Sequence, residues 1–458
     1  MKPTSEPSTL DLLRLHPLQQ RQARHWLHLG VLALAIAGIF ALLLVLSRVP
    51  GASQFFPWID FFRTALVIHV DQSVLIWFLA MAGVIWSVAD NTGTLRFSHL
   101  GTLSFALSVV GTLLIAVSAF FGEGSPLMNN YVPVLQRPLF FIALGLFGAG
   151  IAIRLVLTLI CCEWKKALFK ASPLQVAAIS SAVATAIAIG ALGWSWIDIP
   201  ASISGQGFYE LLFWGAGHSL QFAFSQMLLL AWILLAIASG VPLIFSQRWL
   251  GNCLWIGLVP VLLVPLIYLY YPTVSAESRI AFTRLMQYGG ALAAVPVGLV
   301  LLWGLKRAAP VTADQRPLRL TLIMSMVLFG SGGVIALMIS GINTIIPAHY
   351  HGSIVGVTLA LMGLAYLLLP YLGYKPITGK LACAQPLCYG FGQLLHITGL
   401  ALSGAIGIQR KTAGAAQGLD SLSAKMAMGV MGIGGLLAII GGILFVWIML
   451  VTFFRRRT

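Results

Sequence analysis

Twelve separate apolar stretches, each about 20 residues or longer, constrain this chain more than any other feature. They cover roughly 29–48, 64–88, 98–120, 138–161, 174–197, 210–239, 249–271, 283–304, 319–341, 349–372, 386–408 and 427–454. In hydrocarbon only helices and closed barrels satisfy their own backbone hydrogen bonds, and runs of this length suit helices. The chain of 458 residues, 59% of them hydrophobic and 9% charged, therefore predicts an all-α integral membrane protein with twelve transmembrane helices.

Little sequence remains outside these runs, so the domain organisation is simple. We expect a basic N-terminal segment over 1–28, one transmembrane domain over 29–454 and a basic tail over 455–458. The first run is too long for a cleaved signal peptide and follows a long polar segment, so we expect it to be retained.

The net charge of +15 follows from membrane topology. Most of the 27 lysines and arginines fall in alternate connections, beginning with the N-terminal segment. The positive-inside rule then places both termini in the cytoplasm, and we expect a multi-pass protein of a bacterial inner membrane. The charge therefore gives no reason to expect a nucleic-acid partner, and membrane lipid is the expected surrounding.

The His349-Tyr350-His351 segment opens the tenth run, which the predicted topology starts at the outer face. Histidine is costly inside a membrane and marks a functional site there by default. Since each helical residue turns about 100°, two histidines two residues apart point to nearly opposite flanks. One helix can therefore supply a metal ligand on each side.

A second candidate ligand, His69, lies early in the second run at the depth predicted for His351. Two neutral imidazoles at one depth can hold a haem iron from both axial sides. A third candidate, His218, follows glycines at 215 and 217 that allow close approach of a backbone or a cofactor. His396 fits a hydrogen-bonded core histidine better than a ligand. No ligand role is expected for the remaining histidines, which are His16, His25, His28 and His99.

Together these segments resemble subunit I of the haem–copper oxidoreductases. The resemblance implies that His69 and His351 hold a low-spin haem and His349 a high-spin haem, with b-type haem expected. It assigns His218 to a non-haem iron or copper. Arg410 and Lys411, the basic pair after the eleventh run, would lie over the haem propionates.

The chain departs from this family pattern at two places. The family has adjacent histidines at the end of the seventh span, whereas this chain has no histidine between His218 and His349. Either the non-haem metal is absent, or its ligand set is unusual and includes Tyr270, Tyr271 or Glu210. The second departure is Phe222, which stands where many oxidases carry a tyrosine that supplies an electron for splitting dioxygen.

The resemblance and its departures imply a catalytic subunit that reduces nitric oxide to nitrous oxide. One alternative is a terminal dioxygen reductase. Another is a degenerate haem subunit for electron transfer or sensing, without the non-haem metal. A transporter or scaffold is a weaker alternative, since no internal repeat is visible. A partner subunit carrying haem c or copper is expected to donate electrons.

Overall fold

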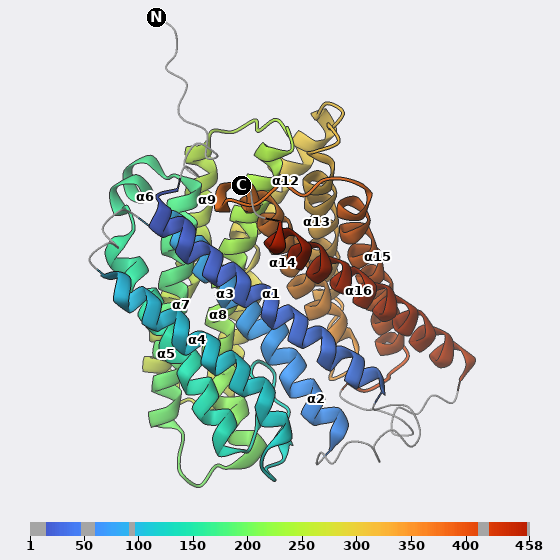
Figure 1. Ribbon diagram of the computed structural model, residues 1–458. Helices are drawn as coiled ribbons and strands as arrows, with labels where there is room; N and C mark the ends of the chain where they lie inside the picture. The colour runs from blue at the N-terminus through green and yellow to red at the C-terminus, as the bar shows by residue number, and fades with distance from the viewer. Residues whose placement is uncertain (1–14, 47–59, 91–96, 411–420, 456–458) are drawn as a thin grey trace, which may run out of the picture. The chain divides into compact units, whose positions relative to one another are not determined.

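The computed structural model describes residues 15–46, 60–90, 97–410 and 421–455, and these residues are almost entirely helical (Figure 1). The chain forms two compact units. The first comprises residues 1–230 and 243–306, and the second comprises residues 231–242 and 307–458.

Apolar helices dominate both units, and the expected all-α membrane architecture is confirmed. Within the described ranges, eleven helical segments are long and apolar enough to cross a membrane. The remaining apolar run also forms a helix, α15 (Lys380–Ala405), whose 26 residues are long enough to cross but less apolar. The twelve predicted spans therefore all correspond to helices.

The first unit contains the helices up to α12 and one short hairpin. Its α-helices are α1 (Pro17–Leu46), α2 (Phe61–Val70), α3 (Trp77–Ala89), α4 (Ser98–Val117), α5 (Pro138–Cys161), α6 (Trp164–Lys170), α7 (Pro173–Asp198), α8 (Gly205–Ala238), α9 (Gln247–Leu258), α10 (Val264–Tyr270), α11 (Ala276–Gly289) and α12 (Ala291–Arg307). The last turns of α8 belong to the second unit. The hairpin pairs β1 (Pro126–Leu127) with β2 (Val134–Leu135) in antiparallel register.

Three segments of this unit differ from the simple spans that the apolar runs suggested. α1 begins at Pro17, so the polar residues before 29 form its first turns. Between α2 and α3 lies a π-helical segment, η3 (Asp71–Ile76). Between α9 and α10 lie the 3₁₀ turns of η6 (Val259–Leu263), which contain Pro260. Proline lacks a backbone N–H and disrupts the regular hydrogen-bond pattern, which explains the last of these breaks.

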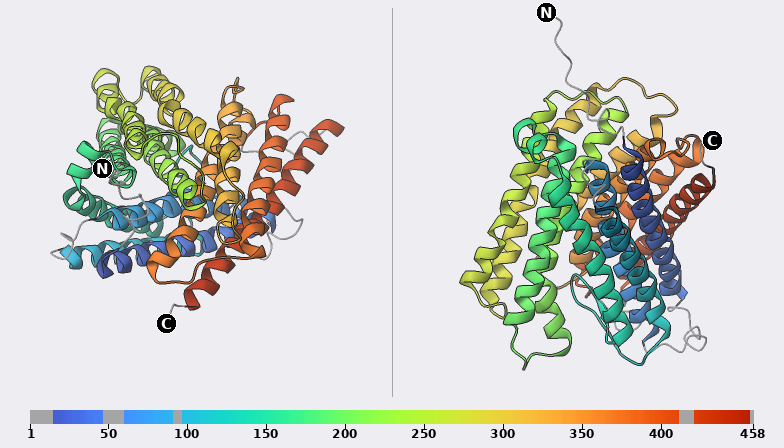
Figure 2. Two further views of the ribbon diagram at one scale, coloured as in Figure 1. Left: turned by 90° about the horizontal axis from the view of Figure 1, so that it is seen from above. Right: turned by 60° about the vertical axis from the view of Figure 1, so that its left-hand side comes forward.

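The second unit packs four long helices, drawn orange to red in Figures 1 and 2. They are α13 (Arg316–Ala336), α14 (Ile345–Leu368), which continues into η7 (Leu369–Leu372), α15 and α16 (Leu422–Phe454). Where α13 crosses α14, a Cβ on Gly352 would lie only 2.6 Å from the Cα of Gly332. Such glycines let membrane helices approach closely, and this contact positions the start of α14.

A buried ion pair ties three helices of the first unit together. Arg154 on α5 donates from Nη2 to Oδ2 of Asp90 at 3.0 Å, and both side chains are almost fully buried. Nη1 of the same arginine donates to Oε1 of Gln22 on α1, also at 3.0 Å. Removing one partner of such a pair leaves the other charge buried without compensation.

Arg154→Met should therefore destabilise the protein by about 3–5 kcal/mol, because Asp90 would remain buried and unpaired. The matched control is Arg63→Met, since Arg63 forms an ion pair with Asp60 while 55% exposed. Loss of this exposed pair should cost less than about 1 kcal/mol. Thermal unfolding of the detergent-solubilised protein measures both changes, and equal melting temperatures for the two variants would contradict the account.

Candidate functional site

His69 lies in the last turn of α2, directly before the π-helical segment. Its Nδ1 is 2.9 Å from the backbone carbonyl oxygen of Ala37 on α1. A carbonyl only accepts hydrogen bonds, so Nδ1 carries the proton and Nε2 presents a lone pair. This is the arrangement that orients a metal-ligating histidine. π-helical turns are frequent at functional sites, and the one after His69 was not visible in the apolar pattern.

His349 has the same arrangement in the second unit. Its Nδ1 donates to the carbonyl oxygen of Gly332 on α13 at 2.8 Å, within reach because of the close Gly332–Gly352 contact. One turn later, Ser353 donates from Oγ to the His349 carbonyl oxygen at 3.1 Å. Nε2 is therefore the nitrogen of His349 that is suited to ligate a metal.

His351 points toward a different helix from His349, as the two-residue spacing predicted. Its ring meets the ring of His396 on α15 edge to face, with the centroids 5.0 Å apart. His396 in turn donates from Nδ1 to the carbonyl oxygen of Met431 on α16 at 3.0 Å. His396 is thus a half-buried histidine with a hydrogen bond to the backbone, and it also packs against the candidate ligand His351.

The segment after α15 brings Arg410 to the end of the second unit that carries these histidines. Asn343 and Gln409 form an antiparallel bridge, and the N–H of Thr344 donates to the carbonyl oxygen of Ile408 at 3.1 Å. Thr344 directly precedes α14, so Arg410 lies near the helix start from which His349 and His351 project. Lys411, the other member of the predicted basic pair, lies outside the described residues.

His218 is buried on α8 inside an aromatic cluster of the first unit. Its ring lies 4.8 Å from Trp214, 5.1 Å from Tyr131 and 5.8 Å from Phe282, measured between centroids. Its Nδ1 is 2.8 Å from the Trp214 carbonyl oxygen and 2.9 Å from the Tyr131 hydroxyl. The Trp214 carbonyl only accepts, so Nδ1 carries the proton and Nε2 carries the lone pair that could ligate a metal.

Sequence reasoning missed Tyr131, which lies in the hairpin between β1 and β2. Asn130 donates from its backbone N–H and its side-chain amide to the Glu210 carboxylate, which fixes the hairpin against α8. Burial, and to a lesser degree the charge of Glu210, raise the pKa of Tyr131 above its usual range. Tyr131 is therefore a neutral hydrogen-bonding partner of His218, and Glu210 holds the loop that carries it.

The two tyrosines suggested as alternative ligands do not join this cluster. Tyr270 is 77% exposed and Tyr271 is 40% exposed, so they do not contribute to a buried site around His218. The inward side chain is Tyr268, which packs on Phe282 and shares a 2.8 Å hydrogen bond with Ser195. The buried positions 261, 264 and 268 follow helical spacing, a signal that could have identified Tyr268.

Three further observations describe the chemistry around His218. Phe222, one turn further along α8, is 2% exposed and belongs to the same apolar cluster. Trp214 Nε1 is buried and has no hydrogen-bond partner among the described residues, so the cluster offers a donor to an added acceptor. In the described ranges, no group of three or more histidine, cysteine, aspartate or glutamate side chains is placed to hold a metal ion.

Gly217 makes the contact between Tyr131 and His218 possible, because a Cβ there would lie 2.1 Å from Cγ of Tyr131. Gly217→Ala should therefore displace the hairpin and destabilise the protein by about 1–3 kcal/mol, a typical cost of overpacking. Gly207→Ala is the control on the same helix, since its nearest neighbour would lie 3.8 Å away. A melting temperature that falls equally in both variants would contradict the proposed packing.

Comparison with known proteins places this geometry in a family. A family model described as cytochrome c and quinol oxidase polypeptide I matches residues 21–444. An uncharacterized protein of Rickettsia prowazekii (strain Madrid E) is 31% identical over 93% of this chain and 94% of its own length. An uncharacterized protein of Aquifex aeolicus (strain VF5) is 27% identical over 78% of this chain and 86% of its own length.

The fold also resembles a solved structure. A heme-copper terminal oxidase dimer determined by cryo-EM matches with a TM-score of 0.64 and 15% identity, covering 99% of this chain and 85% of that one. The family model extends over most of the sequence and includes His69, His218, His349 and His351. The chain therefore belongs to the cytochrome c and quinol oxidase polypeptide I family, the subunit I family of the haem–copper oxidoreductases.

Proposed function

We propose that this protein is the haem-containing catalytic subunit of a respiratory oxidoreductase that reduces nitric oxide. We place it in a bacterial inner membrane with both termini in the cytoplasm, as the distribution of basic residues favours. A partner subunit carrying haem c or copper would donate the electrons. The family supports the membrane location and the oxidoreductase class, and the chain's own residues support the choice of substrate.

One observation carries the proposal: His69 and His349 each donate from Nδ1 to a backbone carbonyl oxygen of a neighbouring helix. The carbonyl fixes the tautomer and the direction of each ring, so both side chains are prepared to ligate iron through Nε2. We assign His69 and His351 to a low-spin haem and His349 to a high-spin haem. Bound b-type haems would supply one-electron transfer and an iron that accepts a small gas.

Other residues of the chain would support these haems. Arg410, near the start of α14, is suited to neutralise propionate carboxylates by charge-assisted hydrogen bonds, and Lys411 would assist it. His396 packs on His351 and would limit rotation of that ring. The roles of Arg410 and His396 do not require a charged side chain in the apolar interior of the bundle, where a charge is costly.

The residues around His218 favour nitric oxide over dioxygen. Coupling two molecules of nitric oxide consumes two electrons and two protons and releases nitrous oxide and water. Complete reduction of dioxygen needs four electrons, and Phe222 cannot supply one as a tyrosine does. His218 Nε2 would face the substrate or a non-haem iron or copper, with Tyr131 fixing the ring through Nδ1.

A second candidate function is electron transfer or gas sensing without a non-haem metal. The surroundings of His218 favour it, because three aromatic rings surround the imidazole and Tyr270 is too exposed to complete a ligand set. Terminal dioxygen reduction is the remaining alternative. Turnover of the purified protein with each gas, together with copper and iron analysis, separates the three.

Replacing single histidines tests the haem assignment. His69→Leu and His351→Leu should each remove the low-spin haem signal, because six-coordinate iron needs both imidazoles. His349→Leu should abolish carbon monoxide binding to the reduced protein and leave the low-spin signal. His16→Leu is the control, since His16 is exposed outside the apolar runs. A low-spin signal that survives in both of the first two variants would overturn the assignment.

Turnover assays test the substrate. The purified protein with an artificial electron donor should convert nitric oxide to nitrous oxide and reduce dioxygen weakly or not at all. Phe222→Tyr should not change this preference, because one phenol does not restore the missing histidines of the seventh span. Full dioxygen turnover in Phe222→Tyr would contradict our account of the site.

A further inference from the structure

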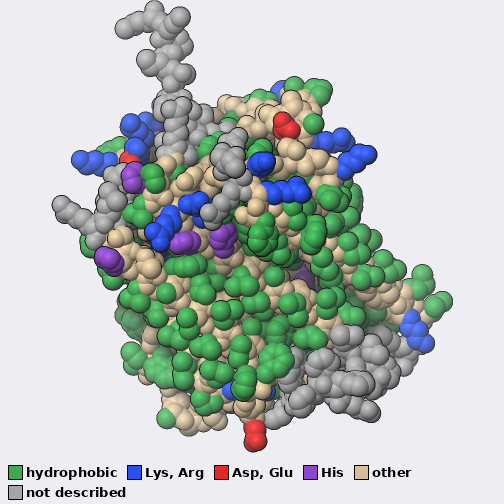
Figure 3. All heavy atoms as spheres, in the orientation of Figure 1, with side chains coloured by type: hydrophobic (Ala, Val, Ile, Leu, Met, Phe, Trp, Pro, Cys, Tyr) green, Lys and Arg blue, Asp and Glu red, His purple; other side chains and the backbone are tan. Residues whose placement is uncertain are grey.

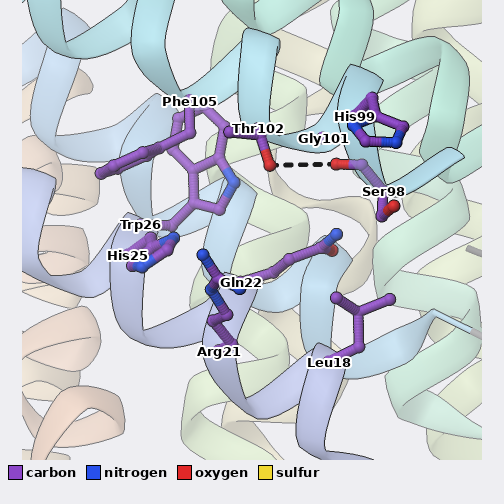
Figure 4. Close-up of a pocket in the computed structure, with 10 residues that line it drawn as sticks. All are labelled: Leu18, Arg21, Gln22, His25, Trp26, Ser98, His99, Gly101, Thr102 and Phe105. Atoms are coloured by element: carbon purple, nitrogen blue, oxygen red, sulfur yellow. Dashed lines mark hydrogen bonds between the residues drawn. The ribbon is translucent and has the colours of Figure 1, made fainter. Parts of the chain in front are cut away.

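A cavity of about 200 Å³ opens between the N-terminal turns of α1 and α4, within the first unit (Figure 4). Arg21 and His25 reach it from α1, and His99 lies at the start of α4. The cavity lining contains no aspartate or glutamate among the described residues, and Arg21 makes no ion pair there. The cavity therefore combines several positively charged or proton-accepting nitrogens without any compensating acid.

The side-chain amide of Gln22 is an uncharged donor at this cavity, and its orientation is set by Arg154 of the buried Arg154–Asp90 ion pair. Gln22 lines the cavity, and its Oε1 accepts the hydrogen bond from Arg154 Nη1 at 3.0 Å. An arginine only donates, so the Gln22 oxygen must face Arg154 and the Nε2 hydrogens must point the other way. The first turn of α4 adds backbone N–H groups and the positive end of a helix dipole.

The walls of the cavity are apolar and aromatic on the side away from these donors. Trp26 is buried, and Phe105 stacks on His25 with the centroids 4.9 Å apart. Over α1 and α4, basic and histidine side chains gather where the helices begin, and hydrophobic side chains cover the lengths beyond (Figure 3). This boundary between polar and apolar surface is where lipid headgroups lie against a membrane protein.

An exposed apolar stripe continues from the cavity along α4. His99 starts a series at helical spacing, and three of its later members, Leu103, Val110 and Leu113, are 47%, 46% and 42% exposed. On α1 the face that carries Arg21 and His25 continues to Ile39, which is 58% exposed. Acyl chains extending from a headgroup in the cavity would lie along these two faces.

From these observations we propose that the cavity binds the phosphate of an anionic phospholipid. Arginine recognises phosphate oxygens through paired N–H groups, and His99 and Gln22 supply further donors. The cavity is smaller than the roughly 300–1,000 Å³ typical of sites that enclose a whole small molecule. The cavity therefore suits the headgroup phosphate of a lipid whose acyl chains remain outside it. The site is separate from the haem histidines and does not depend on the proposed reaction.

Native mass spectrometry of the purified full chain, titrated with phosphatidylglycerol or phosphatidylcholine, tests the proposal. Wild-type protein should bind phosphatidylglycerol more tightly than phosphatidylcholine. Arg21→Gln should weaken phosphatidylglycerol binding about fivefold, the effect expected of one cation near the membrane surface. Arg21→Lys should retain most of the binding, because the charge remains.

The matched control is Arg248→Gln, which removes another exposed charge from the same predicted side of the membrane, outside the cavity. It should bind phosphatidylglycerol as the wild-type protein does. Equal loss in Arg21→Gln and Arg248→Gln would overturn the proposal, as would equal affinity for the two lipids. Displacement of the lipid by millimolar inorganic phosphate would overturn the lipid assignment in favour of free phosphate. Melting temperatures show that the variants are folded.

Discussion

Hydrocarbon offers no hydrogen bonds, and this constraint shapes both the fold and the candidate haem ligands. Backbone groups must pair within helices, which accounts for the apolar helices of both units. A histidine in such a bundle must also satisfy its ring nitrogens from the protein. His69 and His349 do so by donating from Nδ1 to carbonyl oxygens of neighbouring helices. The hydrogen bond at Nδ1 fixes the orientation of the ring and leaves the Nε2 lone pair for a metal. A bond that burial requires thus also prepares the histidine to act as a ligand.

The same constraint explains why polar groups of the first unit occur in connected sets. Asp90 neutralises Arg154, and Arg154 orients Gln22 toward the cavity between α1 and α4. Glu210 fixes Asn130, and the adjacent Tyr131 bonds to His218. In each set a buried or half-buried charge determines the direction of an uncharged side chain. Neither arrangement can be identified from one residue alone.

The sequence predicted the spans well because length and hydropathy are local properties. It also predicted that His349 and His351 face different neighbours, since helical geometry fixes that relation. It did not predict the π-helical turn after His69, because the apolar composition of a span does not reveal which backbone hydrogen-bond pattern its helix adopts. Tyr131 was missed because a loop has no period that relates it to His218. Tyr270 and Tyr271 were suggested because they stand where the family has its seventh-span histidines, whereas the spacing of the buried positions 261, 264 and 268 indicates that Tyr268 faces inward.

The central claim is that three histidines on two helices hold two haems. The most direct measurement is the haem content of the purified protein, combined with its reduced-minus-oxidised spectrum. The account predicts two b-type haems per chain, of which one is low-spin and one shifts when carbon monoxide is added. A colourless preparation, or a single haem unaffected by carbon monoxide, would contradict it.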